Sequence, residues 1–193
     1  MNGTGTTDTE AEAEVKTFAG FTYDAANTNN QLKGNIAGDG SLELRVYYNR
    51  IVSEVTYSYT GNVPTEAAAA PAAASYRYGA SVTVAADPTA VDGYEVTGWS
   101  RDDFTMPATD VNITAAWTIK SYTITFNSNG GSAVTPITAE YKSAVTKPTD
   151  PSRDGYTFAG WDNLPETMPL GGATVNAQWT ANTNTAYTVK YML

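Results

Sequence analysis

The sequence predicts a mainly β fold made of small modules in tandem, with roughly four strands in each module and little helix. The first observation is an internal repeat, because the motif Gly-Tyr-x-x-x-Gly-Trp occurs at residues 93–99 and again at 155–161. The second is a set of short runs in which apolar and polar residues alternate, as in strands with one buried face. The third is the composition, because 13 tyrosines and frequent threonines favour strands.

The repeat extends well beyond this motif at a constant offset of 62 residues. Thr-Met-Pro at 105–107 returns at 167–169, and Ala-x-Trp-Thr at 115–118 returns at 177–180. Further upstream the offset is 63, which relates Tyr78 to Tyr141. Self-similarity at this period indicates modules arranged in series along the chain.

Each repeat is expected to open and close with an alternating strand. The apolar faces of the opening strands consist of Val55, Tyr57 and Tyr59, then of Tyr122, Ile124 and Phe126. Those of the closing strands consist of Val111, Ile113, Ala115 and Trp117, then of Val175, Ala177 and Trp179. Between them, the Ala-rich stretch 64–75 predicts either one helical turn capped by Thr65 or an irregular loop, since Pro71 interrupts it.

These patterns divide the chain into four segments. Residues 1–50 form a partial module, 51–119 and 120–181 form complete modules, and 182–193 form the opening strand of a following module. The linkers near Asn49–Ser53 and Thr118–Ser121 are too short for free tumbling, so we expect an elongated array. A small module needs large apolar side chains in its core. The repeated residues predicted to supply them are Tyr94, Trp99, Met106, Trp117, Tyr156, Trp161, Met168 and Trp179.

The composition argues against several classes of function. The chain has no cysteine and no histidine, which removes the usual nucleophiles, bases and soft metal ligands, so we expect no catalytic residue, no cofactor and no metal. The net charge of −9, with only 11 lysines and arginines, argues against nucleic-acid binding. No apolar run is long enough to insert into a membrane. Residues 1–14 do not read as a signal peptide, so we expect the chain to be either cytoplasmic or an excised piece of an exported protein.

Residues 122–180 resemble the internalin-type B repeat, also called the Listeria–Bacteroides repeat. The segments that carry this resemblance are 122–131, 147–151, 155–161 and 177–179. Residues 51–119 resemble a divergent copy that retains both tryptophans but lacks the Asn-Gly-Gly turn of residues 129–131. Residues 15–50 resemble the second half of a mucin-binding-protein-like (MucBP) module, through 20–24, 40–44 and Tyr47-Tyr48.

Both resemblances imply small β-grasp-like modules of extracellular, cell-wall-anchored proteins on the bacterial cell surface, with a structural or adhesion role and no enzymatic activity. The implied function is a stalk, a spacer or a weak adhesion module, whose partner would be an unidentified host or cell-wall glycan or protein. The alternative is a carbohydrate-binding module that uses exposed tryptophan and tyrosine. The two hypotheses differ in aromatic exposure, because a sugar site needs two or more coplanar rings open to solvent on one module.

Two other motifs have structural explanations that we prefer. Asp102 and Asp103 are adjacent carboxylates, but neighbours in a strand point to opposite faces and cannot face each other across a glycosidase cleft. Leu-Pro-Glu-Thr-Met at 164–168 resembles a sortase signal, but its Thr-Met-Pro belongs to the repeat.

The two ends of the chain suggest a contact between copies. No strand is expected before Val15, where the sequence consists of glycine, threonine and acidic residues. Residues 187–193 form an opening strand without a module behind it. We therefore expect head-to-tail strand addition, in which residues 187–193 of one molecule pair with the free edge of the first module in another.

Overall fold

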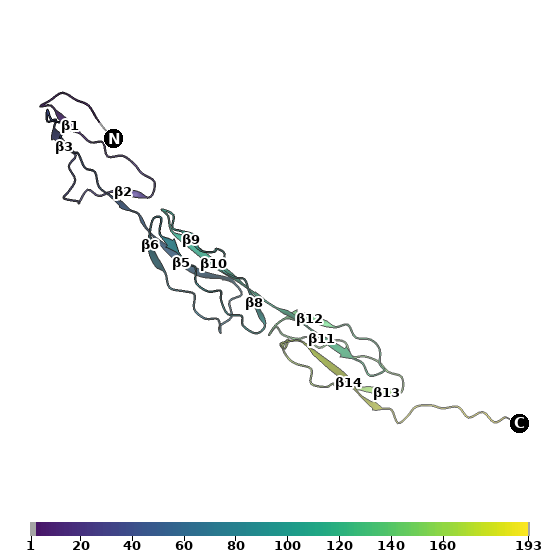
Figure 1. Cartoon of the computed structure of the whole chain (residues 1–193). Helices are drawn as coiled ribbons and strands as arrows, with labels where there is room; N and C mark the ends of the chain where they lie inside the picture. The colour runs from purple at the N-terminus through teal and green to yellow at the C-terminus, as the bar shows by residue number, and fades with distance from the viewer. Residues whose placement is uncertain (1–2, 193) are drawn as a thin grey trace. The chain divides into compact units, whose positions relative to one another are not determined.

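The computed structural model describes residues 3–192, and within them it is all β, as predicted (Figure 1). The first seven strands are β1 (Glu10–Glu12), β2 (Phe21–Tyr23), β3 (Lys33–Asn35), β4 (Tyr48–Arg50), β5 (Val52–Gly61), β6 (Ala74–Arg77) and β7 (Ser81–Val82). The others are β8 (Tyr94–Val96), β9 (Phe104–Thr105), β10 (Val111–Ile119), β11 (Ser121–Asn127), β12 (Ile137–Glu140), β13 (Tyr156–Trp161) and β14 (Ala173–Ala181). No residue from 3 to 192 is helical, and no helix that could cross a membrane occurs among them.

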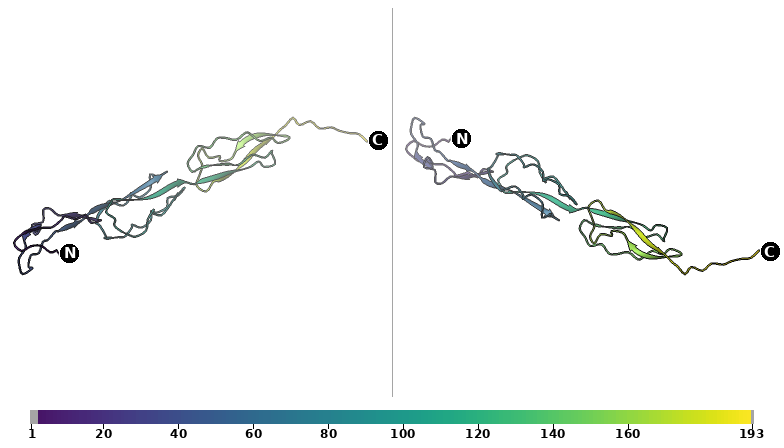
Figure 2. Two further views of the ribbon diagram at one scale, coloured as in Figure 1. Left: turned by 90° about the horizontal axis from the view of Figure 1, so that it is seen from above. Right: turned by 90° about the horizontal axis from the view of Figure 1, so that it is seen from below.

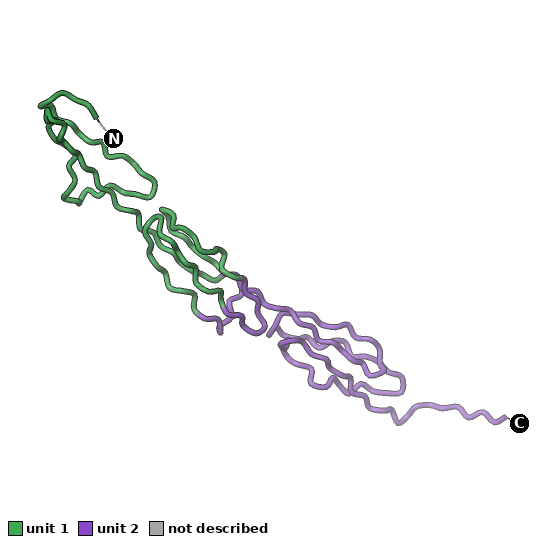
Figure 3. The backbone as a smooth tube through the Cα atoms, in the orientation of Figure 1, with its two compact units in different colours: residues 1–59, 69–88, 98–115 green, residues 60–68, 89–97, 116–193 purple. Residues whose placement is uncertain are grey.

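The chain divides into two units, which Figure 3 shows in green and purple. The first unit comprises residues 1–59, 69–88 and 98–115, and the second comprises 60–68, 89–97 and 116–193. Strands β5 and β10 run from one unit into the other.

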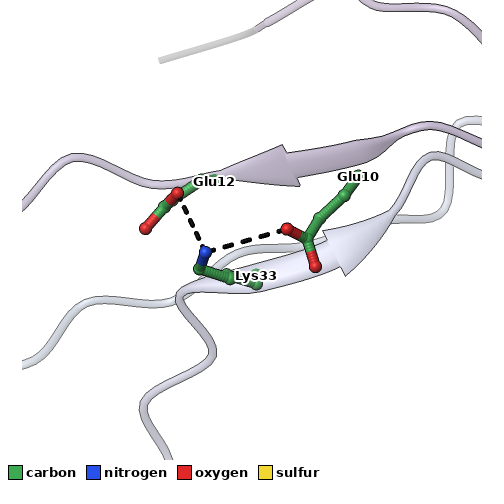
Figure 4. Close-up of polar contacts among 3 residues, drawn as sticks. All are labelled: Glu10, Glu12 and Lys33. Atoms are coloured by element: carbon green, nitrogen blue, oxygen red, sulfur yellow. Dashed lines mark ion pairs between the residues drawn. The ribbon is translucent and has the colours of Figure 1, made fainter.

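The first unit begins with a strand that the sequence pattern did not predict. Strand β1 pairs antiparallel with β3, so the expectation that no strand precedes Val15 is wrong. The Lys33 ammonium on β3 lies 3.1 Å from the Glu12 carboxylate and 3.7 Å from that of Glu10, both on β1 (Figure 4). The hydrogen bond to Glu12 and the charges of both carboxylates raise the pKa of Lys33. Because the alternate residues of β1 are charged and exposed, the strand lacks the apolar alternation from which a strand is predicted.

The next small sheet pairs β2 with β4. Its aromatic residues make a cluster of their own, in which Phe18 and Tyr23 both pack edge-on against the Tyr48 ring. The Tyr48 hydroxyl also accepts the backbone N–H of Lys16 at 2.9 Å. Ring packing thus supplies the apolar contacts of this part of the chain, which lacks a fully buried large side chain among its described residues.

The first repeat forms a four-stranded sheet in the order β6-β5-β10-β8, accompanied by the short pair β7-β9. The core in the first unit contains Val55, Val82, Met106 and Ile113, each at most 2% exposed. The Ala-rich stretch 64–75 begins with one hydrogen-bonded turn, in which Ala67 donates its N–H to the Pro64 carbonyl at 3.1 Å, and is otherwise an irregular loop until β6 begins. Pro71 has no amide hydrogen to donate, which accounts for the loop.

The second repeat forms a sheet in the order β12-β11-β14-β13 in the second unit, and its strands are the green to yellow arrows in the views of Figure 2. The opening strand β11 lies between β12, with which it is antiparallel, and the closing strand β14, with which it is parallel. Threonine and asparagine pairs cross the exposed face, including Thr125 with Thr174 at 2.8 Å and Asn127 with Asn176 at 3.0 Å. On the other face the buried residues are Ile124, Met168 and Val175.

The two repeated methionines occupy the same place in their cores, so they give a first prediction. Met106 and Met168 are each 1% exposed, whereas Met192 is 90% exposed. Replacing either buried methionine with alanine is expected to lower the free energy of unfolding of its repeat by about 2–5 kcal/mol, because apolar contacts are lost and a cavity remains. Urea denaturation measures this loss, with Met192→Ala as a control expected to change stability by less than about 0.5 kcal/mol. Equal effects of the three variants would contradict the assignment of the core.

Candidate functional site

The eight residues predicted to form the repeat core lie at three levels of exposure. Met106, Trp117 and Met168 are buried, and Tyr94, Trp99, Trp161 and Trp179 are half-buried. Tyr156 is 37% exposed and is not a core residue. Its ring lies at the end of the second repeat, where Arg153 stands 3.9 Å from the ring centroid and covers one face.

The half-buried tryptophans pack against other rings of their own repeat. Trp99 stacks on Tyr59, with centroids 5.4 Å apart and planes 7° from parallel, and meets the Tyr57 ring edge-on. Its Nε1 donates to the Ala86 carbonyl at 2.9 Å. Trp161 lies 4.9 Å from the Phe126 ring. The stacked contact between Trp99 and Tyr59 uses a ring face that a sugar would need, so it favours a packing role.

The second repeat shows why its Asn-Gly-Gly turn accompanies the closing tryptophan. Trp179 Nε1 donates to the carbonyl of Ser128, the residue that precedes the turn, at 2.9 Å. Asn129 donates its side-chain amide to the Ala177 carbonyl at 2.9 Å. A Cβ at Gly131 would overlap the Trp179 ring, so the turn must be free of a side chain at this position.

Asp102 and Asp103 border an open groove of about 470 Å³ in the first unit, which Trp99 and Arg101 also line. Asp103 accepts the backbone N–H of Val84 at 2.8 Å and thereby ties two loops together. Asp87, on the same groove, accepts the backbone N–H of Trp99 at 2.8 Å. Carboxylates used in this way fix loop conformation. Within residues 3–192 no group of three or more acidic side chains is placed to hold a metal ion.

The motif that resembles a sortase signal is part of the folded second repeat. Leu164 packs on the core, and Met168 is buried in it. The backbone of this segment is paired, because Met168 N–H donates to Ser143 at 2.8 Å and Val145 N–H donates to Glu166 at 2.9 Å. The buried side chains and paired backbone therefore give this segment a structural explanation.

In the first unit, a tyrosine connects the N-terminal part of the chain to the first repeat. Ile51, between β4 and β5, donates its N–H to the Gly20 carbonyl at 2.9 Å, and its own carbonyl accepts the Tyr78 N–H at 2.7 Å. The Tyr78 ring covers Gly20, which is buried and has φ of 80°, and packs on Phe21 with centroids 5.9 Å apart. A Cβ at Gly20 would overlap the Tyr78 ring.

The same arrangement recurs in the second unit. Lys120, between β10 and β11, donates its N–H to the Gly93 carbonyl at 2.9 Å and accepts the Tyr141 N–H at 2.9 Å. The Tyr141 ring covers the buried Gly93, whose φ is 81°, and packs edge-on against Tyr94. We call this arrangement of a connector residue, a glycine and a tyrosine ring the tyrosine junction.

Each tyrosine junction is linked to the core of the repeat that supplies the tyrosine. The residue after the tyrosine has a positive φ, 76° at Gly79 and 64° at Lys142. Its N–H donates to the carbonyl of the buried methionine, Met106 at 2.9 Å in the first case and Met168 at 3.0 Å in the second. The junction therefore holds the connector against a turn whose backbone is fixed by the core.

Sequence reasoning found the tyrosines but missed the junctions. Tyr78 and Tyr141 are visible as a repeated pair, and the glycines belong to repeated Gly-aromatic pairs. What the sequence does not show is that each tyrosine covers a glycine of the preceding segment, because that contact joins residues far apart in the chain.

At one equivalent position, the second repeat has an aspartate where the first repeat has a serine. Asp162 accepts the backbone N–H of Asn176, and its second oxygen accepts the Asn176 side-chain amide at 3.0 Å. In the first repeat, Ser100 Oγ accepts the Thr114 N–H at 3.0 Å. The backbone N–H of Asn176, followed by its side-chain amide, lowers the pKa of Asp162 below its usual value.

This difference predicts an acid-sensitive contribution to stability at this position of the second repeat that the equivalent position of the first repeat lacks. Because the folded-state pKa of Asp162 is lowered, its contribution is complete above the unfolded-state pKa of about 3.9 and is lost as pH falls through the folded-state value. Asp162→Ser is expected to be less stable than the native chain at pH 7, with a gap that closes in acid. The reciprocal control, Ser100→Asp, should introduce a similar dependence into the first repeat. Urea denaturation across pH measures both, and a gap that does not vary with pH would contradict the role of the carboxylate.

Comparison with known proteins identifies both repeats. Residues 122–190 match the Listeria-Bacteroides repeat domain, and residues 55–121 match the divergent InlB B-repeat domain. A protein of Evansella cellulosilytica described as a Gly-rich membrane protein is 30% identical over 170 residues, which cover 78% of this chain and 19% of that protein. Internalin H of Listeria monocytogenes is 38% identical over 131 residues, which cover 54% of this chain and 24% of internalin H.

The chain thus spans about a fifth to a quarter of the length of these relatives. A solved structure of Streptococcal High Identity Repeats in Tandem (SHIRT) domains 3-4 from a cell surface protein is 15% identical. The match covers 66% of this chain and 96% of that chain, with a TM-score of 0.28 that is too low to carry an argument about fold.

Proposed function

We propose that this chain, which contains a Listeria-Bacteroides repeat domain and a divergent InlB B-repeat domain, is a non-catalytic stalk or spacer segment of a bacterial surface protein. The observation that carries the proposal is the tyrosine junction, which occurs once in each unit with the same hydrogen bonds. A stalk must transmit position from one module to the next, and a connector bonded on both sides by backbone groups suits that role better than a flexible linker.

The packing of the aromatic rings supports a spacer rather than a sugar-binding module. Trp99 and Trp161 contact rings of their own repeat, and flat recognition of a sugar needs open ring faces. Weak adhesion to a host or cell-wall glycan or protein remains part of the proposal as a second role of the same modules. We include an extracellular location in the proposal, because the chain is similar to internalin H and to a protein described as a membrane protein.

The role of the N-terminal part of the chain, which precedes the two repeats, is proposed from its sequence. We extend the proposal to residues 15–50 as a partial MucBP-like module, on the resemblance of their sequence alone. Its contribution would be that of one more module in the series, since Ile51 connects it to the first repeat through a tyrosine junction.

A stalk made of modules in series is expected to be elongated in solution. A single compact globule of this length would have a radius of gyration of about 16 Å, and we expect a clearly larger value. Small-angle X-ray scattering measures it directly, and a value near that of the globule would overturn the stalk. Binding to immobilised glycans, measured in parallel, separates the spacer from the carbohydrate-binding alternative.

Head-to-tail strand addition through residues 187–193 is a further expectation of this proposal. Tyr187 and Tyr191 are 87% and 90% exposed, and their segment alternates as an opening strand does. The acceptor would be the outer edge of β1, which pairs on its other side with β3. Light scattering over a range of concentrations should show association of the full chain, while a chain ending at residue 186 stays monomeric. A full chain that stays monomeric at every concentration would contradict strand addition.

A further inference from the structure

The second repeat ends in the glycine and connector of a third tyrosine junction. Asn182 follows β14 as Lys120 follows β10, 62 residues earlier, and donates its N–H to the Gly155 carbonyl at 2.9 Å. Gly155 has φ of 75°, close to the values at Gly20 and Gly93. The backbone on this side of the junction therefore already has the conformation that the two complete junctions use.

The surface of this third copy is open where the other two are covered. Apart from its own chain neighbours, no atom of residues 3–192 lies within 4 Å of the position that a Cβ would take at Gly155. Gly155 is half-buried, whereas Gly20 and Gly93 are buried under tyrosine rings. The adjacent Tyr156 is exposed, while its equivalents Phe21 and Tyr94 are half-buried against those rings. Arg153 covers one face of the Tyr156 ring, and the rest of the ring stays accessible.

We propose that Gly155, Tyr156 and Asn182 form a docking surface for the turn tyrosine of a further repeat module in the same polypeptide. The choice of occupant follows from the two complete junctions, in which the same surface takes a tyrosine from the next segment of the chain. It also follows from residues 187–191, whose alternation matches that of an opening strand. The inference rests on the proposed function in one respect, namely that modules follow one another along the chain.

The geometry defines what the incoming module must provide. Its tyrosine N–H donates to the Asn182 carbonyl, as Tyr78 donates to Ile51 and Tyr141 to Lys120. Its ring covers Gly155 and meets the Tyr156 ring edge-on, and the residue after the tyrosine takes a positive φ, as Gly79 and Lys142 do. The side chain of the connector is free to vary, because isoleucine, lysine and asparagine occupy this position.

The test compares glycine substitutions with and without a following module. An extended chain carries a second copy of residues 121–181 joined directly to Asn182. In the present chain, Gly155→Ala meets only the strain of a positive φ, so it should lower the urea midpoint less than Gly93→Ala, which also displaces the Tyr141 ring. In the extended chain, Gly155→Ala should lower the midpoint as much as Gly93→Ala. Replacing the tyrosine of the added copy with alanine should remove the additional effect of Gly155→Ala.

An equally small effect of Gly155→Ala in both chains would overturn the docking surface. If Gly93→Ala does not fold, hydrogen exchange in the extended chain gives the answer without it. The amide of the added tyrosine should exchange as slowly as that of Tyr141, and exchange at the rate of an exposed amide would also overturn the proposal. Neither measurement depends on the shape of the molecule in solution, so failure of the stalk and failure of the docking surface are distinguishable.

Discussion

Contact between an aromatic ring and a glycine that has no side chain to obstruct it is the interaction on which this structure depends. It occurs where Tyr78 covers Gly20, where Tyr141 covers Gly93 and where Trp179 lies on Gly131. A module of about 60 residues has too little interior to bury all its large rings, so the rings must also find cover at the module ends and turns. Because glycine has no side chain, a ring can pack directly on its backbone and be shielded from solvent there.

The sheets explain why the rings meet these glycines at the same place in each repeat. In the second repeat the opening strand β11 lies between its hairpin partner β12 and the parallel closing strand β14. The buried Met168 then links the core to the turn that carries Tyr141, because its carbonyl accepts the N–H of Lys142. The position of the junction ring is thus determined by core packing and by a backbone bond, and Met106 does the same in the first repeat.

Much of this could be predicted from the sequence, and the failures have physical causes. The alternation in 111–118 and 175–180 predicted the closing strands, since burial on one face leaves a period of two. Strand β1 was missed because backbone pairing with β3 holds it, while its exposed glutamates, which pair with Lys33, leave no apolar pattern. Tyr156 was assigned to the core because it repeats Tyr94, but its exposure depends on whether a tyrosine ring covers it and not on its own residue type. The junctions are contacts between segments far apart in the chain. A repeat pattern shows which positions of two modules are equivalent, but it does not show which residues those positions contact.

The hydrogen bonds of the connector to both its neighbours in the tyrosine junction use backbone atoms, and both isoleucine and lysine occupy this position. This has a consequence for how such arrays change over generations. A duplication or recombination event with its breakpoint at the connector can join two modules whatever the side chain of the connector. A glycine followed by an aromatic residue on one side, and a tyrosine on the other, have to be inherited. Arrays can then lengthen, shorten or exchange parts while the sequences of their modules diverge.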